Sequence, residues 1–174
     1  MKTGGIGGAN TKTGLHFEKR VDFLQVLDAV PGYEIKENGE IFFKDKLVAI
    51  NLRKGSLYKY LEQKDINYEE ILSKKLLPDD AILVLQTNTF YVIEIKFQRV
   101  GGSVDEKLQT SLFKKLQYEK LLKSLGIRVE YIYILNDWFK APAYRDVLEY
   151  IKEVHCDYVF NEITLDRLGL PSAE

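Results

Sequence analysis

Three polar side chains in the middle of the chain have the spacing of a hydrolytic metal site. Residues 91–98 read Tyr-Val-Ile-Glu-Ile-Lys-Phe-Gln, and in a strand alternate side chains point to opposite faces. Glu94, Lys96 and Gln98 then share one face, while apolar side chains fill the other. A carboxylate and an ammonium group inside an apolar sheet are costly unless they pair or bind a metal ion.

A second carboxylate precedes the neighbouring apolar run. Pro78-Asp79-Asp80 comes directly before that run, and the polar residues 86–89 separate it from the strand that carries Glu94. A hairpin with this four-residue loop places Asp79 opposite Lys96 and diagonal to Glu94. A slip of one residue places Asp80 there instead. We therefore favour Asp79 as the partner carboxylate and keep Asp80 as the alternative.

Two carboxylates and an amine that converge in this way suit the hydrolysis of a phosphodiester with the help of Mg²⁺. Mg²⁺ prefers oxygen ligands, polarises phosphate oxygens and lowers the pKa of a bound water. Lys96 could orient that water or stabilise charge on the phosphate oxygens. The alternative is structural, because a Glu-x-Lys pair is common on the solvent-exposed face of an edge strand.

Apolar periodicity and turn residues predict the elements that position these side chains. Asn38-Gly39 between two short apolar runs predicts a hairpin, and Gly126 suits the residue that follows a helix. The predicted helices cover residues 14–29, 55–75, 104–125 and 143–154. The predicted strands cover residues 33–36, 41–43, 47–50, 81–85, 90–97, 127–136 and 157–160. This order predicts an α/β fold with a mixed sheet.

Composition limits the class of protein. The 174 residues suffice for one domain, which we assign to 1–174 with a glycine-rich arm at 1–13. No apolar run approaches the roughly 20 residues that span a bilayer, and the first residues lack the apolar core of a secretory signal, so we expect a cytoplasmic protein without membrane contact. The net charge of −1 argues against a polycation that coats nucleic acid, but not against a nuclease.

Pro78-Asp79, Glu94-x-Lys96 and the helix predicted after them resemble the catalytic core of the PD-(D/E)xK nucleases. Two further segments resemble certain type II restriction endonucleases: residues 7–18, Gly-Gly-Ala-Asn-Thr-Lys-Thr-Gly-Leu-His-Phe-Glu, and Glu94–Gln98 with its continuation to Gly102–Lys107. Together these segments cover the first third and the middle of the chain.

The resemblance implies a four- or five-stranded mixed sheet flanked by helices, and Mg²⁺-dependent hydrolysis of DNA that leaves a 5′-phosphate. It assigns Asp79 and Glu94 as metal ligands, with the carbonyl of Ile95 as a third, and Lys96 as the catalytic lysine. It also implies two further catalytic residues: Glu18, an acid that reaches toward the site, and Gln98, a polar group near the phosphate or the attacking water.

Candidate DNA contacts lie in two segments. Asn10, Thr11, Lys12 and Thr13 follow glycines that permit close approach to DNA, although Thr13 could instead cap a helix. Ser103 begins a Ser-x-x-Glu capping box, and the helix terminus there favours a phosphate. We include Lys107 with Ser103, although the lysines of this helix are expected mostly in solvent.

The function expected from the sequence is site-specific cleavage of double-stranded DNA by a homodimer, because a two-fold pair of small subunits can cut both strands. The alternatives are a nicking, junction-resolving or repair nuclease of the same fold, and a non-catalytic DNA-binding subunit. The presence of Asp79, Glu94 and Lys96 together argues against the last of these.

Overall fold

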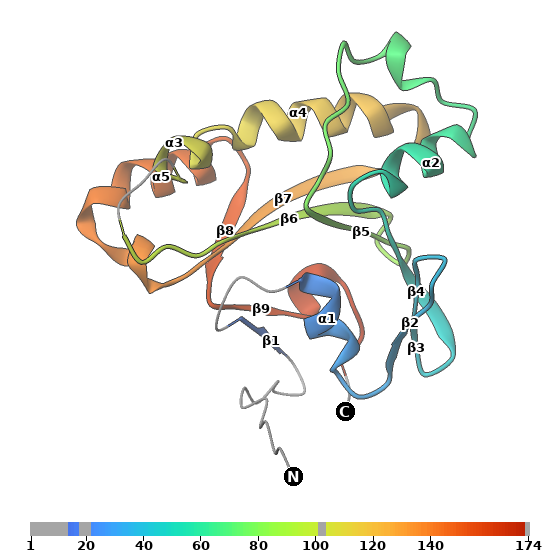
Figure 1. The fold of residues 1–174 in the computed structure, drawn as a ribbon, viewed down its shortest axis with the longest axis horizontal. Helices are drawn as coiled ribbons and strands as arrows, with labels where there is room; N and C mark the ends of the chain where they lie inside the picture. Colours follow the sequence, from blue (N-terminus) through green and yellow to red (C-terminus); the bar gives the residue numbers. More distant parts are fainter. Residues whose placement is uncertain (1–13, 18–21, 101–103, 173–174) are drawn as a thin grey trace.

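A seven-stranded mixed sheet forms the centre of the molecule in the computed structural model, which describes residues 14–17, 22–100 and 104–172 (Figure 1). Neighbouring strands are antiparallel from β2 to β6, and β7 and β8 continue the sheet in parallel with β6. In sheet order the strands are β2 (Tyr33–Ile35), β3 (Glu40–Phe43), β4 (Lys46–Asn51), β5 (Asp80–Val84), β6 (Thr89–Lys96), β7 (Arg128–Leu135) and β8 (Asp157–Phe160).

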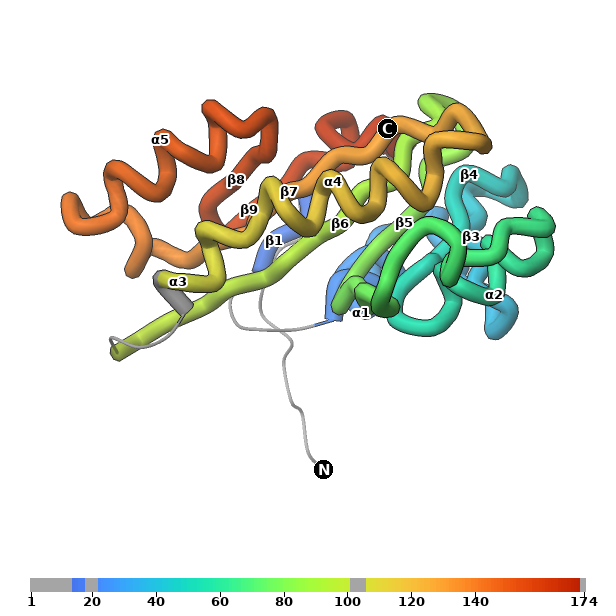
Figure 2. Tube along the Cα trace, turned by 90° about the horizontal axis from the view of Figure 1, so that it is seen from above, coloured from blue at the N-terminus to red at the C-terminus, as the bar shows by residue number. Residues whose placement is uncertain are grey.

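Helices cover both faces of this sheet. One face carries α2 (Ser56–Glu62), α3 (Val104–Leu108), α4 (Ser111–Leu122) and α5 (Arg145–Glu153), with α4 lying between α5 and α2 (Figure 2). The other face carries α1 (Phe23–Asp28) and a small sheet of β1 (Gly14–His16) and β9 (Glu162–Thr164). Short 3₁₀ helices span η1 (Tyr68–Glu70), η2 (Lys123–Leu125), η3 (Asp137–Lys140), η4 (Pro142–Tyr144) and η5 (Asp166–Leu168).

The strand alternation divides the core into two layers. Ile93 and Ile95 point from β6 into the layer shared with α1, whereas Val92 points into the layer shared with α4. Every β6 residue from Thr89 to Ile95 is buried. A polar side chain on the α4 face of β6 is therefore enclosed by helices and must find its partners there.

The mixed α/β class and most of the predicted strands are confirmed, but the sheet has seven strands rather than four or five. The Asn38-Gly39 hairpin is present, with Ile35 opposite Ile41, and so is the third strand, β4. Gly126 follows η2 in the left-handed conformation, φ 64°, as predicted.

The β5–β6 loop begins one residue earlier than predicted. It comprises residues 85–88, so Val84 lies opposite Thr89 and Asp80 lies opposite Ile93. Moving the loop by one residue shifts the pairing by two, which preserves the face of each side chain. Continued by one residue, this register sets Asp79 opposite Glu94, not Lys96.

Three predicted helices are wrong in extent. Residues 14–16 are a strand that pairs with β9, and α1 begins only at Phe23, where the Asp22 carboxylate accepts the Leu24 N–H at 3.0 Å. The helix predicted at 55–75 is limited to α2 and η1. The helix predicted at 104–125 is interrupted near Thr110, whose hydroxyl donates to the Lys107 carbonyl at 2.8 Å.

Within the described residues, no helix combines the length and the apolar character that crossing a bilayer requires.

The hairpin turn at Gly39 provides a test of the backbone. Gly39 has φ 90°, and an added Cβ would lie 3.3 Å from the Asn51 carbonyl oxygen. Gly39→Ala should lower the free energy of unfolding by about 1–2 kcal/mol, because side chains are strained at positive φ. The control is Gly55→Ala, since Gly55 has φ −69° and open space around it. Equal effects of the two substitutions in urea unfolding would contradict this account of the turn.

Candidate active site

The candidate site is centred on Glu94, whose carboxylate is buried between β6 and α4. Glu94 is 6% exposed, and its Oε1 accepts hydrogen bonds from the Tyr131 hydroxyl of β7 and from Lys114 Nζ of α4, the latter at 2.5 Å. Lys96 Nζ lies 2.9 Å from the other oxygen, Oε2, but outside hydrogen-bond geometry. Three side chains from three different elements thus surround one carboxylate.

These neighbours keep Glu94 charged. Burial alone would raise the pKa of Glu94, but the ammonium groups of Lys96 and Lys114 and the Tyr131 hydroxyl outweigh burial and hold this pKa below the usual range. Burial and the nearby Glu94 both raise the pKa of Tyr131, so its hydroxyl stays protonated and donates. Glu94 is therefore an anion that is available to a cation at neutral pH.

Asp79 is the second carboxylate of the site. Its Oδ2 lies 4.0 Å from Lys96 Nζ, and its side chain is 60% exposed, against 14% for Lys96. Lys96 therefore lies between the two carboxylates, and the site opens to solvent on the Asp79 side. The convergence of Asp79, Glu94 and Lys96 that the sequence predicted is present, although the predicted pairing of Asp79 with Lys96 was two residues out of register.

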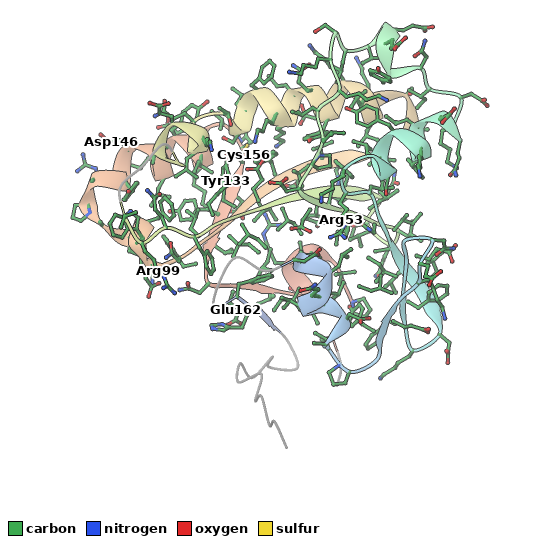
Figure 3. The ribbon with its side chains drawn as sticks, viewed as in Figure 1. Arg53, Arg99, Tyr133, Asp146, Cys156 and Glu162 are labelled. Atoms are coloured by element: carbon green, nitrogen blue, oxygen red, sulfur yellow. The ribbon has the colours of Figure 1, made fainter. Side chains whose placement is uncertain are left out.

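Asp80 points to the opposite face of the sheet, because it pairs with Ile93. There its carboxylate accepts a backbone hydrogen bond from Phe23, near the ion pair of Asp22 with Arg53. Arg53 lies between the sheet and α1, whereas Tyr133 lies on the side of α3 and α4 (Figure 3). The alternative that Asp80 is the partner of Glu94 is therefore wrong.

The donor set of the site fits a hard divalent cation. Mg²⁺ in proteins is commonly held by one or two carboxylates together with waters and substrate phosphates, and Asp79 and Glu94 supply two. Glu94 Oε2 is buried without a hydrogen bond, which leaves a lone pair for a ligand. Ile95, the expected carbonyl ligand, lies between Glu94 and Lys96. No group of three or more His, Cys, Asp or Glu side chains suited to a metal occurs in the parts of the chain that the structure describes.

Other predicted site residues are placed differently or lie outside the described residues. The Gln98 amide donates to the Val100 carbonyl at 2.7 Å, and its backbone N–H donates to the Asn136 side chain at 3.1 Å, so these hydrogen bonds join the segments that follow β6 and β7. Lys107 has an exposed side chain on α3, and its carbonyl accepts from the Tyr133 hydroxyl at 3.2 Å. Outside the described residues lie Glu18, Asn10, Thr11, Lys12, Thr13 and Ser103.

Sequence reasoning missed Lys114 and Tyr131. The sequence predicts that the lysines of this helix lie mostly in solvent, yet Lys114 reaches Glu94. A signal was available, since Lys114 precedes Tyr118 by four residues and shares its helix face, and Tyr118 is 1% exposed. A lysine that shares a face with a core tyrosine is a candidate partner for a buried acid.

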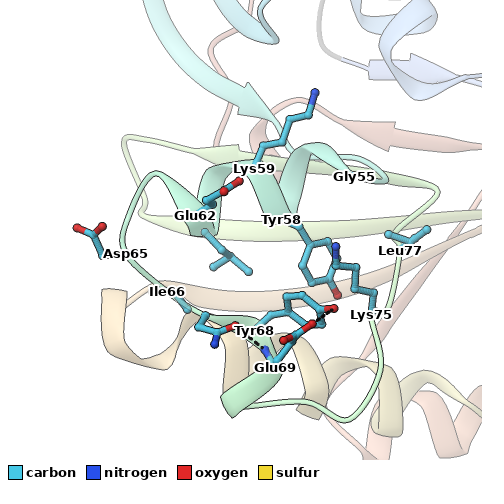
Figure 4. Close-up of a pocket in the computed structure, with 12 residues that line it drawn as sticks. Gly55, Tyr58, Lys59, Glu62, Asp65, Ile66, Tyr68, Glu69, Lys75 and Leu77 are labelled. Atoms are coloured by element: carbon cyan, nitrogen blue, oxygen red, sulfur yellow. Dashed lines mark hydrogen bonds between the residues drawn. The ribbon is translucent and has the colours of Figure 1, made fainter.

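A groove with a volume of about 830 Å³ lies between α2 and η1 (Figure 4). The rings of Tyr58 and Tyr68 pack edge to face with centroids 5.1 Å apart, and Lys75 Nζ lies 5.2 Å and 4.6 Å from their centroids. Leu77, which immediately precedes Pro78-Asp79, is 55% exposed at the edge of this groove. Leu77 thus lines the groove only two residues before Asp79 in the sequence.

Comparisons with models of protein families, with curated protein sequences and with solved structures found no match for this chain. Its function therefore has to be inferred from the site.

Asp80 gives a pH-dependent test of the two faces. Burial first, and then the charge of Asp22, raise the pKa of Asp80 from 3.8 to about 6. A carboxyl group whose pKa is higher in the folded state destabilises the fold when it ionises. The destabilisation by Asp80 therefore grows as the pH rises from about 4 to about 6, and it stays constant above pH 6. Asp80→Asn should therefore stabilise the protein by about 2–3 kcal/mol more at pH 7.5 than at pH 4.

The measurement is urea unfolding across this pH range, with Asp146→Asn as the control, because the side chain of Asp146 is 84% exposed. If Asp80→Asn changes the free energy of unfolding by the same amount at every pH, then Asp80 is not a buried acid.

Proposed function

We propose that the chain is a Mg²⁺-dependent DNA endonuclease of the PD-(D/E)xK kind, similar to type II restriction endonucleases. The observation that carries the proposal is the position of Lys96 Nζ, 2.9 Å from the Glu94 carboxylate and 4.0 Å from that of Asp79. Proline-aspartate before one strand and Glu-x-Lys on the next thus converge at one opening. The mixed sheet flanked by helices is compatible with this kind of nuclease core.

Asp79 and Glu94 would hold the metal, with the Ile95 carbonyl as a further ligand. Bound there, Mg²⁺ would polarise the scissile phosphate and lower the pKa of a coordinated water. Substrate and water would enter on the side of Asp79, which is exposed to solvent. The buried Glu94 would hold the metal at a fixed position. The Lys96 ammonium lies between them, where it can orient the attacking water and stabilise charge that develops on the phosphate oxygens.

The proposed substrate is double-stranded DNA, cut to leave 5′-phosphates by a homodimer, because one site per subunit requires two subunits to cut both strands. The groove of Tyr58, Tyr68 and Lys75 offers a second surface for DNA, since lysine binds phosphate and aromatic rings stack on bases. Discrete double-strand fragments from plasmid DNA would favour restriction, whereas single-strand nicks or branched-DNA cleavage would favour a nicking or junction-resolving nuclease.

Asp79→Asn is the cleanest test of catalysis. The side chain is 60% exposed, so loss of its ion pair with Lys96 should lower the free energy of unfolding by no more than about 1 kcal/mol. The loss of one metal ligand should nevertheless reduce Mg²⁺-dependent cleavage of supercoiled plasmid by at least about 10²-fold. The control is Asp45→Asn, an exposed acid in the β3–β4 turn. Full cleavage by folded Asp79→Asn, or no cleavage of diverse DNA by the unsubstituted protein with Mg²⁺, would refute the proposal.

Lys96→Met tests the role of the amine separately from metal binding. We expect a loss of cleavage rate of about 10²–10³-fold, because one preorganised positive charge is removed from the transition state. Removal of a cation should not weaken the binding of Mn²⁺, measured calorimetrically. The matched control is Lys120→Met, whose side chain is exposed on α4. A weakened Mn²⁺ affinity with an unchanged rate at saturating Mn²⁺ would contradict the assigned role.

A further inference from the structure

Lys114 is the feature of the site that the proposed mechanism does not use. It comes from α4, and its Nζ lies 2.5 Å from Glu94 Oε1, on the oxygen that also accepts the Tyr131 hydroxyl. Lys96 Nζ lies 2.9 Å from the other oxygen without a hydrogen bond to it. Glu94 therefore has an ammonium group beside each of its two oxygens, although a single ammonium group would balance its charge.

The charges of this cluster balance without a metal ion. Asp79 and Glu94 contribute two negative charges, and Lys96 and Lys114 contribute two positive charges. A divalent cation that enters between the two carboxylates meets both ammonium groups at close range, where like charges repel by several kcal/mol at the effective dielectric of a protein surface. At least one ammonium group must move away before such an ion is held.

Lys114 is better placed to move than Lys96. Lys96 is 14% exposed and lies between both carboxylates, whereas the Lys114 side chain is 26% exposed. The flexible four-carbon stem of Lys114 can turn its ammonium group from the carboxylate toward solvent. Its departure leaves the Tyr131 hydroxyl on Oε1, so that Glu94 stays oriented.

On the basis of the proposed nuclease function, we propose that Lys114 is a gate: it neutralises Glu94 in the metal-free protein and transfers to a DNA phosphate when a divalent cation binds. A DNA phosphate held next to the cation would offer the Lys114 ammonium group a new anionic partner in place of Glu94. DNA then draws Lys114 away from Glu94 and strengthens metal binding, and by linkage the metal strengthens DNA binding by the same factor.

A purely structural role for Lys114 gives the opposite expectation. If Lys114 only fixes α4 on the sheet and orients Glu94, then its loss disorders a metal ligand and weakens metal binding. If Lys114 competes with the metal, then its loss strengthens metal binding in the absence of DNA. The direction of the change in metal affinity therefore separates the two roles.

The test uses Ca²⁺, an ion that takes oxygen ligands, and isothermal titration calorimetry of the full chain without DNA. Lys114→Gln keeps a side-chain amide that can donate to Glu94 Oε1 but removes the charge, and we expect it to bind Ca²⁺ at least about tenfold more tightly than the unsubstituted protein. Lys114→Arg, which keeps the charge, should stay close to the unsubstituted protein. So should Lys120→Gln, because Lys120 is exposed on the same helix.

Thermal unfolding in chelator verifies that each variant is folded, and Lys114→Met serves in place of Lys114→Gln if the latter is not. The gate is also supported if Lys114→Gln (or Lys114→Met) binds Ca²⁺ while no binding is detected for the unsubstituted protein. Equal or weaker binding by the charge-free variant, when the unsubstituted protein binds Ca²⁺, overturns the gate and leaves the nuclease proposal standing. Absence of binding by both proteins overturns the gate and the proposed metal site together.

Discussion

The burial of the Glu94 carboxylate is the constraint on which the arrangement of this region depends. An ion in the middle of a sheet loses its hydration and requires compensation by charges and hydrogen bonds of good geometry. Here Lys96 supplies a charge from the same strand, and Lys114 and Tyr131 supply a charge and hydroxyl from α4 and β7. The positions of three elements are thus tied to one carboxylate, and removal of any one partner leaves a buried charge less well compensated.

The two faces of β5 and β6 use their acids differently. On the α4 side, Glu94 stays ionised because cations surround it, and Asp79 keeps the site open to solvent. On the α1 side, Asp80 is buried near the acid Asp22, and its raised pKa reflects a charge that is poorly compensated. Adjacent aspartates thus have separate environments because the strand sends them to opposite faces. The proposed chemistry is therefore assigned to the α4 face, where Glu94 stays ionised.

The sequence predicted which side chains share a face, but not the full register or the helix partner. The β5–β6 loop was misplaced because Leu85, apolar but 39% exposed, lies in the loop, while Thr89, polar but 1% exposed, lies in the strand. Since the resulting error was two residues in pairing, the convergence of Asp79 and Glu94 survived it. The pairing of β1 with β9 could not be predicted from local periodicity, because the two strands come from opposite ends of the chain.

The role of Lys114 was hidden by the pattern of α4. Leu116 and Phe113 are 44% and 64% exposed, so these two apolar residues point away from the buried face of the helix, which Tyr118 marks. A buried acid on the neighbouring strand decides which lysine turns inward, and this requires the three-dimensional arrangement. The alternation of side chains along a strand therefore sufficed to predict the strand residues of the site. It could not predict Lys114, because the packing of α4 on the sheet brings that residue to Glu94.

The central claim is that Asp79 and Glu94 share one divalent cation. The most direct measurement is a crystal structure of the protein grown with Mn²⁺, in which anomalous scattering locates the metal. The account predicts an anomalous peak about 2.0–2.3 Å from a carboxylate oxygen of Asp79 and of Glu94, with Lys114 Nζ displaced from Glu94. Mn²⁺ bound elsewhere on the protein, with the Lys96–Glu94–Lys114 contacts intact, would contradict it.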